Sequence, residues 1–353
     1  MSIQDSPKAL RAEDSFDIAA MQRWLNQEIP GLTGLPEVQQ FPGGASNLTY
    51  LLTYPDRELI LRRPPAGTKA ASAHDMAREF TVQQHLQEPF GLVPQVYALC
   101  QDHEVIGSDF YVMERLQGVV LRANLPANLP LSAQQARVLS EHAVDVLVQL
   151  HQVDPDTAGL RELGRGTGYV NRQVAGWSKR YRAARTENVP DFAAVMVWLA
   201  ENQPDDVANC VIHNDYRLDN LVLNPTDLSV RGVLDWEMAT LGDPLMDLGG
   251  ALAYWVEADD DAGMQSARRQ PTNVPGMLTR QEVVDRYASK SGLSVQDWPF
   301  YEVFGMFRVA VIAQQIYYRY HHGQTTNPAF KDFCHWVTYA EWRCRQVAGL
   351  PSA

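Results

Sequence analysis

Cysteine is scarce in this sequence, and its spacing argues against two common uses of it. The 353 residues include four cysteines, with neither the density of a secreted disulfide scaffold nor the paired spacing of a zinc site. We therefore expect buried or free thiols and no zinc. The four are Cys100, Cys210, Cys334 and Cys344.

Long apolar runs and an excess of basic residues are also missing. No apolar run approaches the roughly 20 residues that span a bilayer, and the segment from Met1 to Asp5 lacks the basic and apolar pattern of a signal sequence. We expect a cytoplasmic protein with no membrane partner. The net charge of −12 argues against nucleic acid as a partner, because Lys and Arg lead binding to a phosphate backbone. The oligomeric state has no signature in the sequence.

The remaining composition is that of an ordinary folded protein. Apolar residues make up 45% and charged residues 20% of the chain, so disorder is not expected. A length of 353 residues is large for one hydrophobic core and suits two lobes or domains. No internal repeat or low-complexity linker occurs, and the densest acidic run, 257–261, is predicted to be a solvated loop.

The most informative segment is 213–220, which reads His-Asn-Asp-Tyr-Arg-Leu-Asp-Asn, with Leu-Asp-Trp-Glu following at 234–237. Phosphoryl transfer from ATP needs little covalent chemistry from the protein. It needs a positioned acceptor hydroxyl and magnesium to neutralise charge. Asp215 is predicted to be the catalytic residue that meets the hydroxyl. Asn220 and Asp235 are predicted to act in catalysis as metal ligands, because amide and carboxylate oxygens suit Mg²⁺.

Short β-prone runs flank both parts of this pattern. They lie at 211–212, 221–223 and 230–234, so the loop is expected to be held between strands. The alternative is a surface turn with solvated carboxylates, since Asn-Asp and Asp-Asn pairs are common turn formers. The order of strand, loop and strand favours the catalytic interpretation.

The sequence resembles the aminoglycoside phosphotransferase family, the small-molecule relatives of protein kinases. The catalytic loop of that family usually reads His-Gly-Asp, four variable residues and Asn, whereas this chain has Asn214 in place of Gly. The substitution leaves the acidic and amide residues of the motif in place and is expected to affect the backbone conformation of the loop. The segment 242–248 resembles the Gly-Asp-Pro-x-x-Asp-Leu of the family. The resemblance implies an α+β, bilobal, protein-kinase-like fold with a small β-rich N-lobe and a larger, mostly helical C-lobe, and ATP and Mg²⁺ as cofactors.

The first third of the chain is predicted to be a small sheet with one helix. Two strands are expected within 39–54, a third over 58–63 and a helix over 74–86. The turn between the first two strands is by itself an ordinary hairpin turn. The resemblance implies that it covers the nucleotide phosphates, because glycine lets backbone N–H groups approach closely. The residues expected to bind nucleotide there are Gly43, Gly44, Ser46 and Asn47.

The third strand carries Arg62 and Arg63 where the family usually has a phosphate-binding Lys. Side chains alternate across a strand, so Arg62 shares a face with Ile60, and Arg63 points to the opposite face. Matching the strand to the kinase Val-Ala-Ile-Lys pattern places Arg62 at the nucleotide phosphates, which a guanidinium can bind. Glu79 on the following helix is its predicted ion-pair partner. The alternative is two exposed cations on an edge strand.

The run 110–118 resembles the hinge between the lobes. The resemblance therefore divides the chain into an N-lobe, 1–115, and a C-lobe, 116–353. Main-chain groups of Glu114 and Leu116 are expected to contact adenine, with Met113 at the back of the nucleotide pocket. Without the resemblance, the run is a buried strand that ends at Gly118.

Beyond the hinge the chain is predicted to be mostly helical. Ser132 is a plausible N-cap for a helix that reaches residue 151, and the apolar spacing of this segment implies a buried face. Further helices are expected over 171–185, 192–202, 245–255, 280–291, 301–320 and 330–346.

Two of these helices carry candidate acceptor-binding residues. Cations in 171–185 could hold phosphates, and the aromatic rings between them could stack on a base or line an acyl channel. The alternative is an amphipathic surface helix with the rings in the core and the cations in solvent. The candidates are Trp177, Lys179, Arg180, Tyr181, Tyr318 and Arg319, together with Glu237 from the second part of the catalytic pattern.

These patterns predict an enzyme that moves the γ-phosphate of ATP, with Mg²⁺, to a hydroxyl of a small-molecule substrate. A branch that resembles this chain is found fused to acyl-CoA dehydrogenase domains, which points to a hydroxyacyl-CoA acceptor. One alternative is a kinase of aminoglycosides or other antibiotics. Another is a nucleotide-binding pseudokinase that regulates a partner, which the presence of Asp215, Asn220 and Asp235 together argues against. A metal-dependent hydrolase should lack the glycine turn, the basic strand and the hinge.

Overall fold

The computed structural model describes residues 7–42, 47–65 and 75–351. The chain forms two compact units. Unit 1 consists of Met1–Val120, Ala158–Leu160 and Asn220–Ala239. Unit 2 consists of Leu121–Thr157, Arg161–Asp219 and Thr240–Ala353. The chain therefore crosses from unit 2 to unit 1 inside the segment 213–220, while the lobe boundary after residue 115 stays a prediction.

Unit 1 is built on a six-stranded antiparallel sheet with the strand order β1-β2-β3-β4-β6-β5. The strand predicted over 58–63 is β4, a central strand whose alternating side chains are buried on both faces. The strands are β1 (Lys8–Ala9), β2 (Glu37–Gln40), β3 (Leu48–Thr53), β4 (Glu58–Arg63), β5 (Val96–Cys100) and β6 (Phe110–Glu114).

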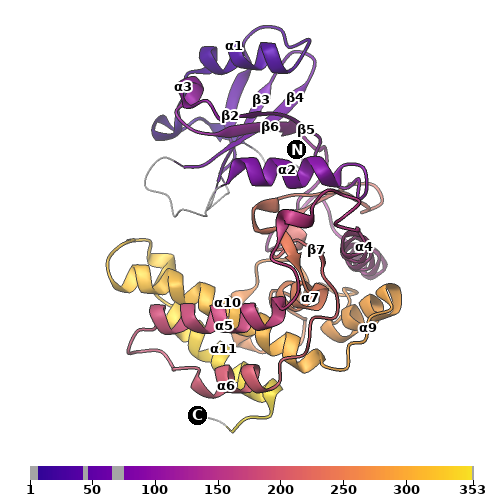
Figure 1. Ribbon diagram of the computed structural model, residues 1–353, viewed down its shortest axis with the longest axis vertical. Coiled ribbons are helices and arrows are strands. Elements are labelled where there is room, and N and C mark those ends of the chain that lie inside the picture. Colours follow the sequence, from indigo (N-terminus) through magenta and orange to yellow (C-terminus); the bar gives the residue numbers. More distant parts are fainter. Residues whose placement is uncertain (1–6, 43–46, 66–74, 352–353) are drawn as a thin grey trace. The chain divides into compact units, whose positions relative to one another are not determined.

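A helix packs on each face of this sheet (Figure 1). Helix α1 (Ile18–Glu28) contributes to the core that buries Leu59 and Leu61. Helix α2 (Met76–Leu86) contributes to the core that buries Ile60. A short third helix, α3 (His103–Ile106), packs against α1. Because side chains alternate along β4, Arg62 lies on the face that α2 covers and Arg63 on the face that α1 covers.

Unit 1 also contains a hairpin from later in the chain. Strands β8 (Leu221–Leu223) and β9 (Val230–Val233) pair antiparallel, and a single helical turn, Trp236–Met238, follows them. These strands confirm the two β-prone runs predicted on the C-terminal side of the catalytic loop.

Unit 2 is mostly helical and is organised around its longest helix, α10, which packs on α5, α7 and α11 (Figure 1). It also has a two-stranded antiparallel pair, β7 (Cys210–Ile212) and β10 (Thr240–Gly242). The predicted helices are present with ends shifted by a few residues. They are α4 (Ala133–His151), α5 (Tyr169–Ala184), α6 (Ala193–Glu201), α7 (Pro244–Leu252), α9 (Arg280–Ser291), α10 (Trp298–His321) and α11 (Phe333–Ala348). A further helix, α8 (Ala262–Ala267), was not predicted.

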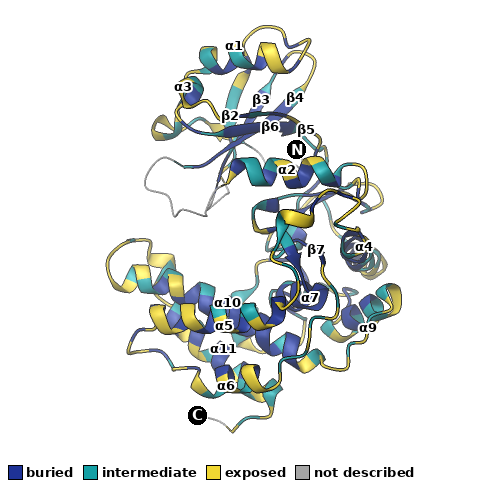
Figure 2. Ribbon diagram, in the orientation of Figure 1, coloured by how far each residue is buried: buried dark blue, intermediate teal, exposed yellow. Residues whose placement is uncertain are grey.

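The contact between α7 and α10 depends on two glycines. A Cβ atom at Gly305 would lie 2.2 Å from the carbonyl oxygen of Gly249, and one at Gly249 would lie 2.5 Å from that of Tyr301. The absence of these side chains lets the two backbones approach. Helix α7 is almost wholly buried as a result, as Figure 2 shows.

Two expectations from composition can be compared with the described residues. All four cysteines are buried and free, as predicted. No helix in the described ranges has both the length and the apolar character needed to cross a bilayer.

Candidate active site

Asp215 lies in unit 2, in the loop that follows β7. The residue before it, Asn214, has a φ of 65°, in the left-handed region that Asn adopts more readily than most residues with a side chain. The Tyr169 hydroxyl bonds to Asn214 Oδ1 at 3.2 Å. The substitution of Asn for the usual Gly therefore keeps a backbone conformation that suits either residue.

The backbone of this loop is anchored by Asp247, the last acidic residue of the segment 242–248. The amides of His213 and Asn214 donate to its two carboxylate oxygens, each at 2.8 Å. His151 Nε2 lies 3.2 Å from Asp247 Oδ2, and His151 Nδ1 lies 2.8 Å from the Tyr287 hydroxyl. Burial alone would raise the pKa of Asp247, but the hydrogen bond from His151, the two nearby His residues and the backbone bond lower it. An ionised carboxylate thus fixes the loop from within the core.

The carboxylate of Asp215 is partly exposed and has a cation beside it. Its side chain is 30% exposed, and Oδ1 lies 3.6 Å from Arg217 Nε. The Arg217 guanidinium lies over the Tyr254 ring, 5.0 Å from the centroid, and its Nε is 3.1 Å from Asp219 Oδ1. The Asp215 amide donates to His213 Nδ1 at 3.2 Å. A carboxylate on a loop restrained in this way can accept a proton from a bound hydroxyl group.

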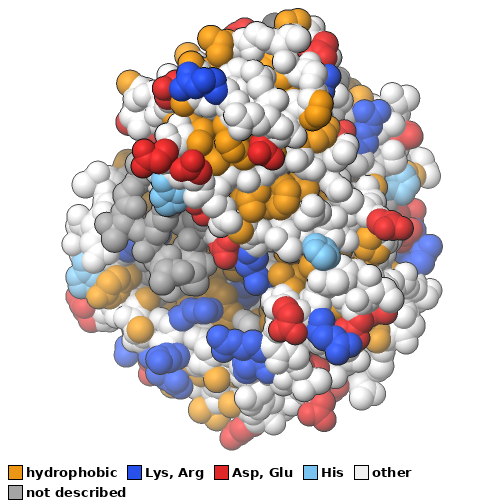
Figure 3. Space-filling view, turned by 45° about the horizontal axis from the view of Figure 1, so that its top comes forward, with side chains coloured by type: hydrophobic (Ala, Val, Ile, Leu, Met, Phe, Trp, Pro, Cys, Tyr) orange, Lys and Arg blue, Asp and Glu red, His pale blue; other side chains and the backbone are white. Residues whose placement is uncertain are grey.

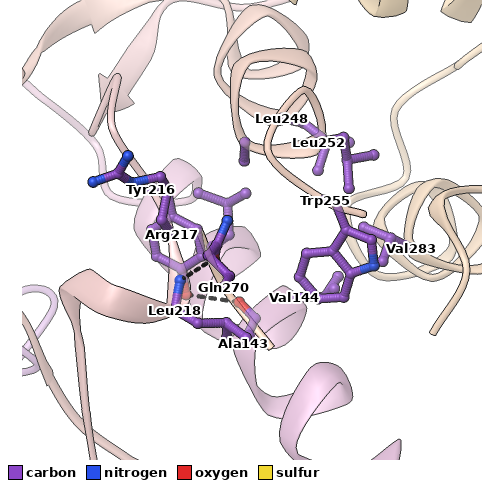
Figure 4. Close-up of a pocket in the computed structure, with 12 residues that line it drawn as sticks. Ala143, Val144, Tyr216, Arg217, Leu218, Leu248, Leu252, Trp255, Gln270 and Val283 are labelled. Atoms are coloured by element: carbon purple, nitrogen blue, oxygen red, sulfur yellow. Dashed lines mark hydrogen bonds between the residues drawn. The ribbon is translucent and has the colours of Figure 1, made fainter. Parts of the chain in front are cut away.

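A small cavity adjoins the loop, lined mostly by apolar side chains such as Trp255 (Figure 4). Its volume of about 20 Å³ is near the minimum for one water molecule, so it cannot hold an acceptor. Gln270 lies beside it and is buried. Its Oε1 accepts from the Leu218 amide at 2.6 Å, and its Nε2 donates to the Tyr254 carbonyl at 3.3 Å. This cavity is a packing gap behind the loop and not a substrate site.

Asn220 and Asp235 lie in unit 1, at one end of the β8–β9 hairpin. Leu221 pairs with Val233, and the Leu234 amide donates to the Asn220 carbonyl at 2.8 Å. The register therefore brings the two predicted metal ligands to the same end of the hairpin. Asp235 has a φ of 69°.

The chemistry of these two side chains fits magnesium. Within the described residues, no group of three or more His, Cys, Asp or Glu side chains is arranged to hold a metal. A magnesium ion needs no such group, because it is commonly bound through one or two carboxylates together with substrate phosphates and waters.

Arg62 joins the sheet to the hairpin within unit 1. Its side chain is only 9% exposed, with Nη1 3.3 Å from Glu79 Oε1 and Nη2 2.9 Å from Asp235 Oδ1. The predicted ion pair with Glu79 is present. The alternative of an exposed edge-strand cation is wrong, because β4 lies between β3 and β6. Burial raises the pKa of Glu79 by more than Arg62 lowers it, and the nearby carboxylates of Asp235 and Glu237 add to the rise.

Arg63 points to the other face of β4 and is equally buried. Its Nε donates to the Tyr50 hydroxyl at 3.1 Å and its Nη2 to the Asp14 carbonyl at 2.5 Å. The guanidinium also lies over the Phe16 ring, 5.1 Å from the centroid. Arg63 therefore ties the N-terminal segment to the sheet.

The glycine turn is only partly described. Gly43, Gly44 and Ser46 lie outside the described residues. Asn47 is buried, and its Nδ2 donates to Glu237 Oε2 at 2.8 Å. Glu237, predicted to contact the acceptor, thus lies in unit 1 beside a predicted nucleotide-binding residue.

The predicted hinge begins in β6. Met113 is buried there, and the Glu114 amide donates to the Gln95 carbonyl at 2.7 Å. Glu114 also pairs with Leu59 of β4, and its contact with adenine stays a prediction. The Leu116 side chain packs on Gly232, where a Cβ atom would lie 2.3 Å from Leu116 Cδ1.

The candidate acceptor residues on α5 separate into surface and core. Lys179 and Arg180 are exposed, and the Arg180 guanidinium lies 4.5 Å from the centroid of the buried Trp177 ring. Tyr181 is 0% exposed, and its hydroxyl donates to the Pro190 carbonyl at 2.5 Å. Its assignment to the acceptor site is corrected here, since a fully buried ring with a bonded hydroxyl is part of the core.

The second set of candidates lies near the end of α10. Arg319 is exposed, and Tyr318 is half-buried with its ring centroid 4.2 Å from that of His322. On the face shown in Figure 3, Lys and Arg side chains gather in the lower part of the view, although the chain carries a net charge of −12.

Residues 37–282 match the model described as "Phosphotransferase enzyme family", a span that includes the catalytic loop, the hairpin and the Arg62 ion pairs. This chain belongs to that family. The resemblance inferred from the sequence is thereby confirmed.

Curated relatives of this family member are longer proteins. Mouse acyl-CoA dehydrogenase family member 10 is 36% identical over 317 residues, which cover 88% of this chain and 29% of that protein. Human acyl-CoA dehydrogenase family member 11 is 34% identical over 317 residues, which cover 87% of this chain and 40% of that protein. The chain thus spans less than half of either relative.

Solved structures agree with the predicted fold. The "putative aminoglycoside phosphotransferase" from Ralstonia eutropha superposes with a TM-score of 0.82 at 29% identity, covering 95% of this chain and 99% of that one. A complex of aminoglycoside phosphotransferase APH(4)-Ia with AMP-PNP and hygromycin B gives a TM-score of 0.57 at 14% identity, covering 94% of this chain and 98% of that one. With its sheet unit and helical unit, this chain has the kinase-like α+β fold.

Proposed function

We propose that the chain uses ATP and Mg²⁺ to phosphorylate a hydroxyl group of a small molecule. The observation that carries this proposal is the buried Arg62 guanidinium, held between Glu79 at 3.3 Å and Asp235 at 2.9 Å. A cation fixed by two carboxylates is oriented before any ligand arrives and can bind phosphate oxygens in two places at once. It also links the sheet to a residue with metal-binding chemistry.

In this proposal each residue of the site has one task. Asp215 positions the acceptor hydroxyl and accepts its proton. Asn220 and Asp235 would hold Mg²⁺, which supplies neutralisation of phosphate charge when it is bound. Arg62 contacts the phosphates, and Glu79 keeps it oriented. The remaining nucleotide contacts are assigned to Gly43, Gly44, Ser46, Asn47, Met113, Glu114 and Leu116.

We infer that the acceptor is a hydroxyacyl-CoA. The relatives that carry the name acyl-CoA dehydrogenase support this choice, since each includes a segment that matches most of this chain. The exposed cations Lys179 and Arg180 are suited to phosphate groups, and the Arg180 guanidinium lies over the Trp177 ring. Tyr318, Arg319 and Glu237 are retained as further acceptor candidates.

The deciding experiment offers hydroxyacyl-CoA esters, the matching free hydroxy acids and kanamycin-like amines to one preparation with labelled ATP. We expect the thioesters to turn over fastest, and Asp215→Asn to lower that rate by about 10² to 10⁴ while leaving ATP binding intact. Faster turnover of the amines would indicate an antibiotic kinase. ATP binding without turnover of any acceptor would indicate a pseudokinase.

The acceptor surface has its own test. Changing Lys179 and Arg180 together to Ala should raise KM for the thioester and leave KM for ATP unchanged. The control changes Arg137 and Lys290 to Ala, two exposed cations on α4 and α9 of the same unit. An unchanged thioester KM in the first variant would remove α5 from the acceptor site.

A further inference from the structure

We propose that Arg308 is a positioning residue that holds the catalytic loop in its working conformation. Arg308 lies in the middle of α10, where it is a lone cation in an apolar run from Val303 to Val311. It is only 8% exposed. Its Nη2 donates to the Asn214 carbonyl at 2.6 Å. The inference rests on the proposed role of Asp215, the residue whose peptide bond begins at that carbonyl.

The contact acts on the one peptide that sets the direction of the Asp215 side chain. Asn214 is held on both sides, because its amide donates to Asp247 at 2.8 Å while its carbonyl accepts from Arg308 at 2.6 Å. Its left-handed backbone, with a φ of 65°, costs more for a residue with a Cβ atom than for glycine, although Asn tolerates it better than most. Two bonds from the core, one at each end of this residue, stabilise that conformation. Arg308 thereby fixes where the next residue begins.

The guanidinium is itself held by two helices. A Cβ atom at Gly250 would lie 2.8 Å from Arg308 Nη1, so this glycine of α7 leaves room for the cation. The centroid of the Trp177 ring of α5 lies 5.5 Å from the guanidinium carbon. In the described part of the chain, no carboxylate forms an ion pair with Arg308. Burial of a cation without a carboxylate costs free energy. We infer that this cost is accepted because the bond to the Asn214 carbonyl positions the loop.

The test compares two buried side chains of the same helix. Gln314 is also buried, and its Nε2 donates to the Ala184 carbonyl at 2.8 Å, far along α10 from the loop contact. Arg308→Met and Gln314→Met each remove one bond from α10 to a backbone carbonyl. Arg308→Lys keeps the charge and one donor, and covers the case in which the Met variant does not fold.

We expect Arg308→Met to lower kcat by about tenfold to a hundredfold, since small misplacements of a reacting group cost this much, and to leave KM for ATP unchanged. Amide hydrogen exchange over 213–219 should become faster. Arg308→Lys should recover part of both losses. Gln314→Met should lose stability with kcat and loop exchange unchanged.

Two results would overturn the proposal: loop exchange that stays unchanged in both Arg308 variants, or an equal loss of kcat in Gln314→Met. Turnover is followed with the acceptor that reacts fastest in the panel described above, and otherwise with ATP hydrolysis. Hydrogen exchange needs no acceptor. It therefore decides the role of Arg308 even where wild-type protein phosphorylates nothing, which would reject the proposed function alone.

Discussion

Asn214, the residue before Asp215, shows how side-chain type and backbone conformation constrain each other. Asn214 has a φ of 65° and a side chain bonded to Tyr169. We predict that Asn214→Ala lowers the free energy of unfolding by about 1 to 2 kcal/mol, the cost of a left-handed residue that has a Cβ atom but no local hydrogen bond. Asn214→Gly, which restores the usual residue of the family, should stay within about 1 kcal/mol of wild type. Urea denaturation measures both, and equal stability of the Ala variant would contradict the conformational argument.

Two neighbouring arginines are predicted to have opposite effects. Arg62→Ala should raise KM for ATP or lower turnover, because it removes the cation that Glu79 and Asp235 orient. Arg63→Ala should leave KM for ATP unchanged but lower stability by about 2 kcal/mol or more, since it breaks buried bonds from a charged donor to Tyr50 and Asp14.

Steady-state kinetics and thermal melting of the two variants separate these effects. Sequence alone places Arg63 away from the nucleotide but gives no reason for a loss of stability, which its burial supplies. A rise in KM for ATP in the Arg63 variant, with none in the Arg62 variant, would refute the assignment.

Among the elements, the β8–β9 hairpin carries both predicted metal ligands at one end. We predict that Asp235→Ala weakens ATP binding far more with Mg²⁺ present than without it, and that Asn220→Ala does so to a smaller extent. Asp227 lies between the two strands, where it bonds to the Ser229 amide at 2.9 Å. Asp227→Ala is therefore the matched control. Calorimetry that finds the same magnesium dependence in all four proteins would rule out the metal assignment.

The α7–α10 contact makes a second prediction at this scale. Gly305→Ala should destabilise the protein by about 1 to 3 kcal/mol or more, because its Cβ atom would lie 2.2 Å from the Gly249 carbonyl oxygen. Gly176 on α5 is the control, with no atom within 4 Å of an added Cβ. Gly176→Ala should stabilise α5 by up to about 1 kcal/mol. Chemical denaturation compares the two, and a neutral Gly305→Ala would show that the helices can separate without cost.

For the whole molecule, local sequence patterns predicted the features that depend on residues close in sequence, such as strand alternation and helix caps. The alternation of β4 placed Arg62 and Arg63 on opposite faces, and Ser132 was recognised as the N-cap of α4. The roles of Asp215 as the residue that meets the acceptor and of Asn220 and Asp235 as metal ligands stay predictions. Helix α1 was missed although its apolar residues recur at helical spacing, with Met21 and Leu25 in the core and Trp24 packed against it.

Contacts between distant segments could not be predicted in the same way. Asn47 bonds to Glu237 across 190 positions of sequence, and Arg308 reaches Asn214 across 94. Tyr181 was a candidate acceptor residue because cations surround it in sequence, with a place in the core as the alternative. The packing of Phe192 and Phe307 against its ring shows that it belongs to the core. A signal for Arg308 was nevertheless present, since a single cation in a long apolar run needs a partner in the core.

The four buried thiols allow the unfolding of each unit to be followed by chemical labelling. Burial raises the pKa of the thiols of Cys100, Cys210 and Cys344, and the thiolate is the form that alkylating reagents attack. Native protein should therefore react slowly, at a rate set by opening of the structure around each thiol. Cys100 lies in unit 1 and the other three lie in unit 2. Mass spectrometry of the order in which they are alkylated during unfolding would reveal whether the sheet unit and the helical unit lose structure together or one after the other, with no engineered label.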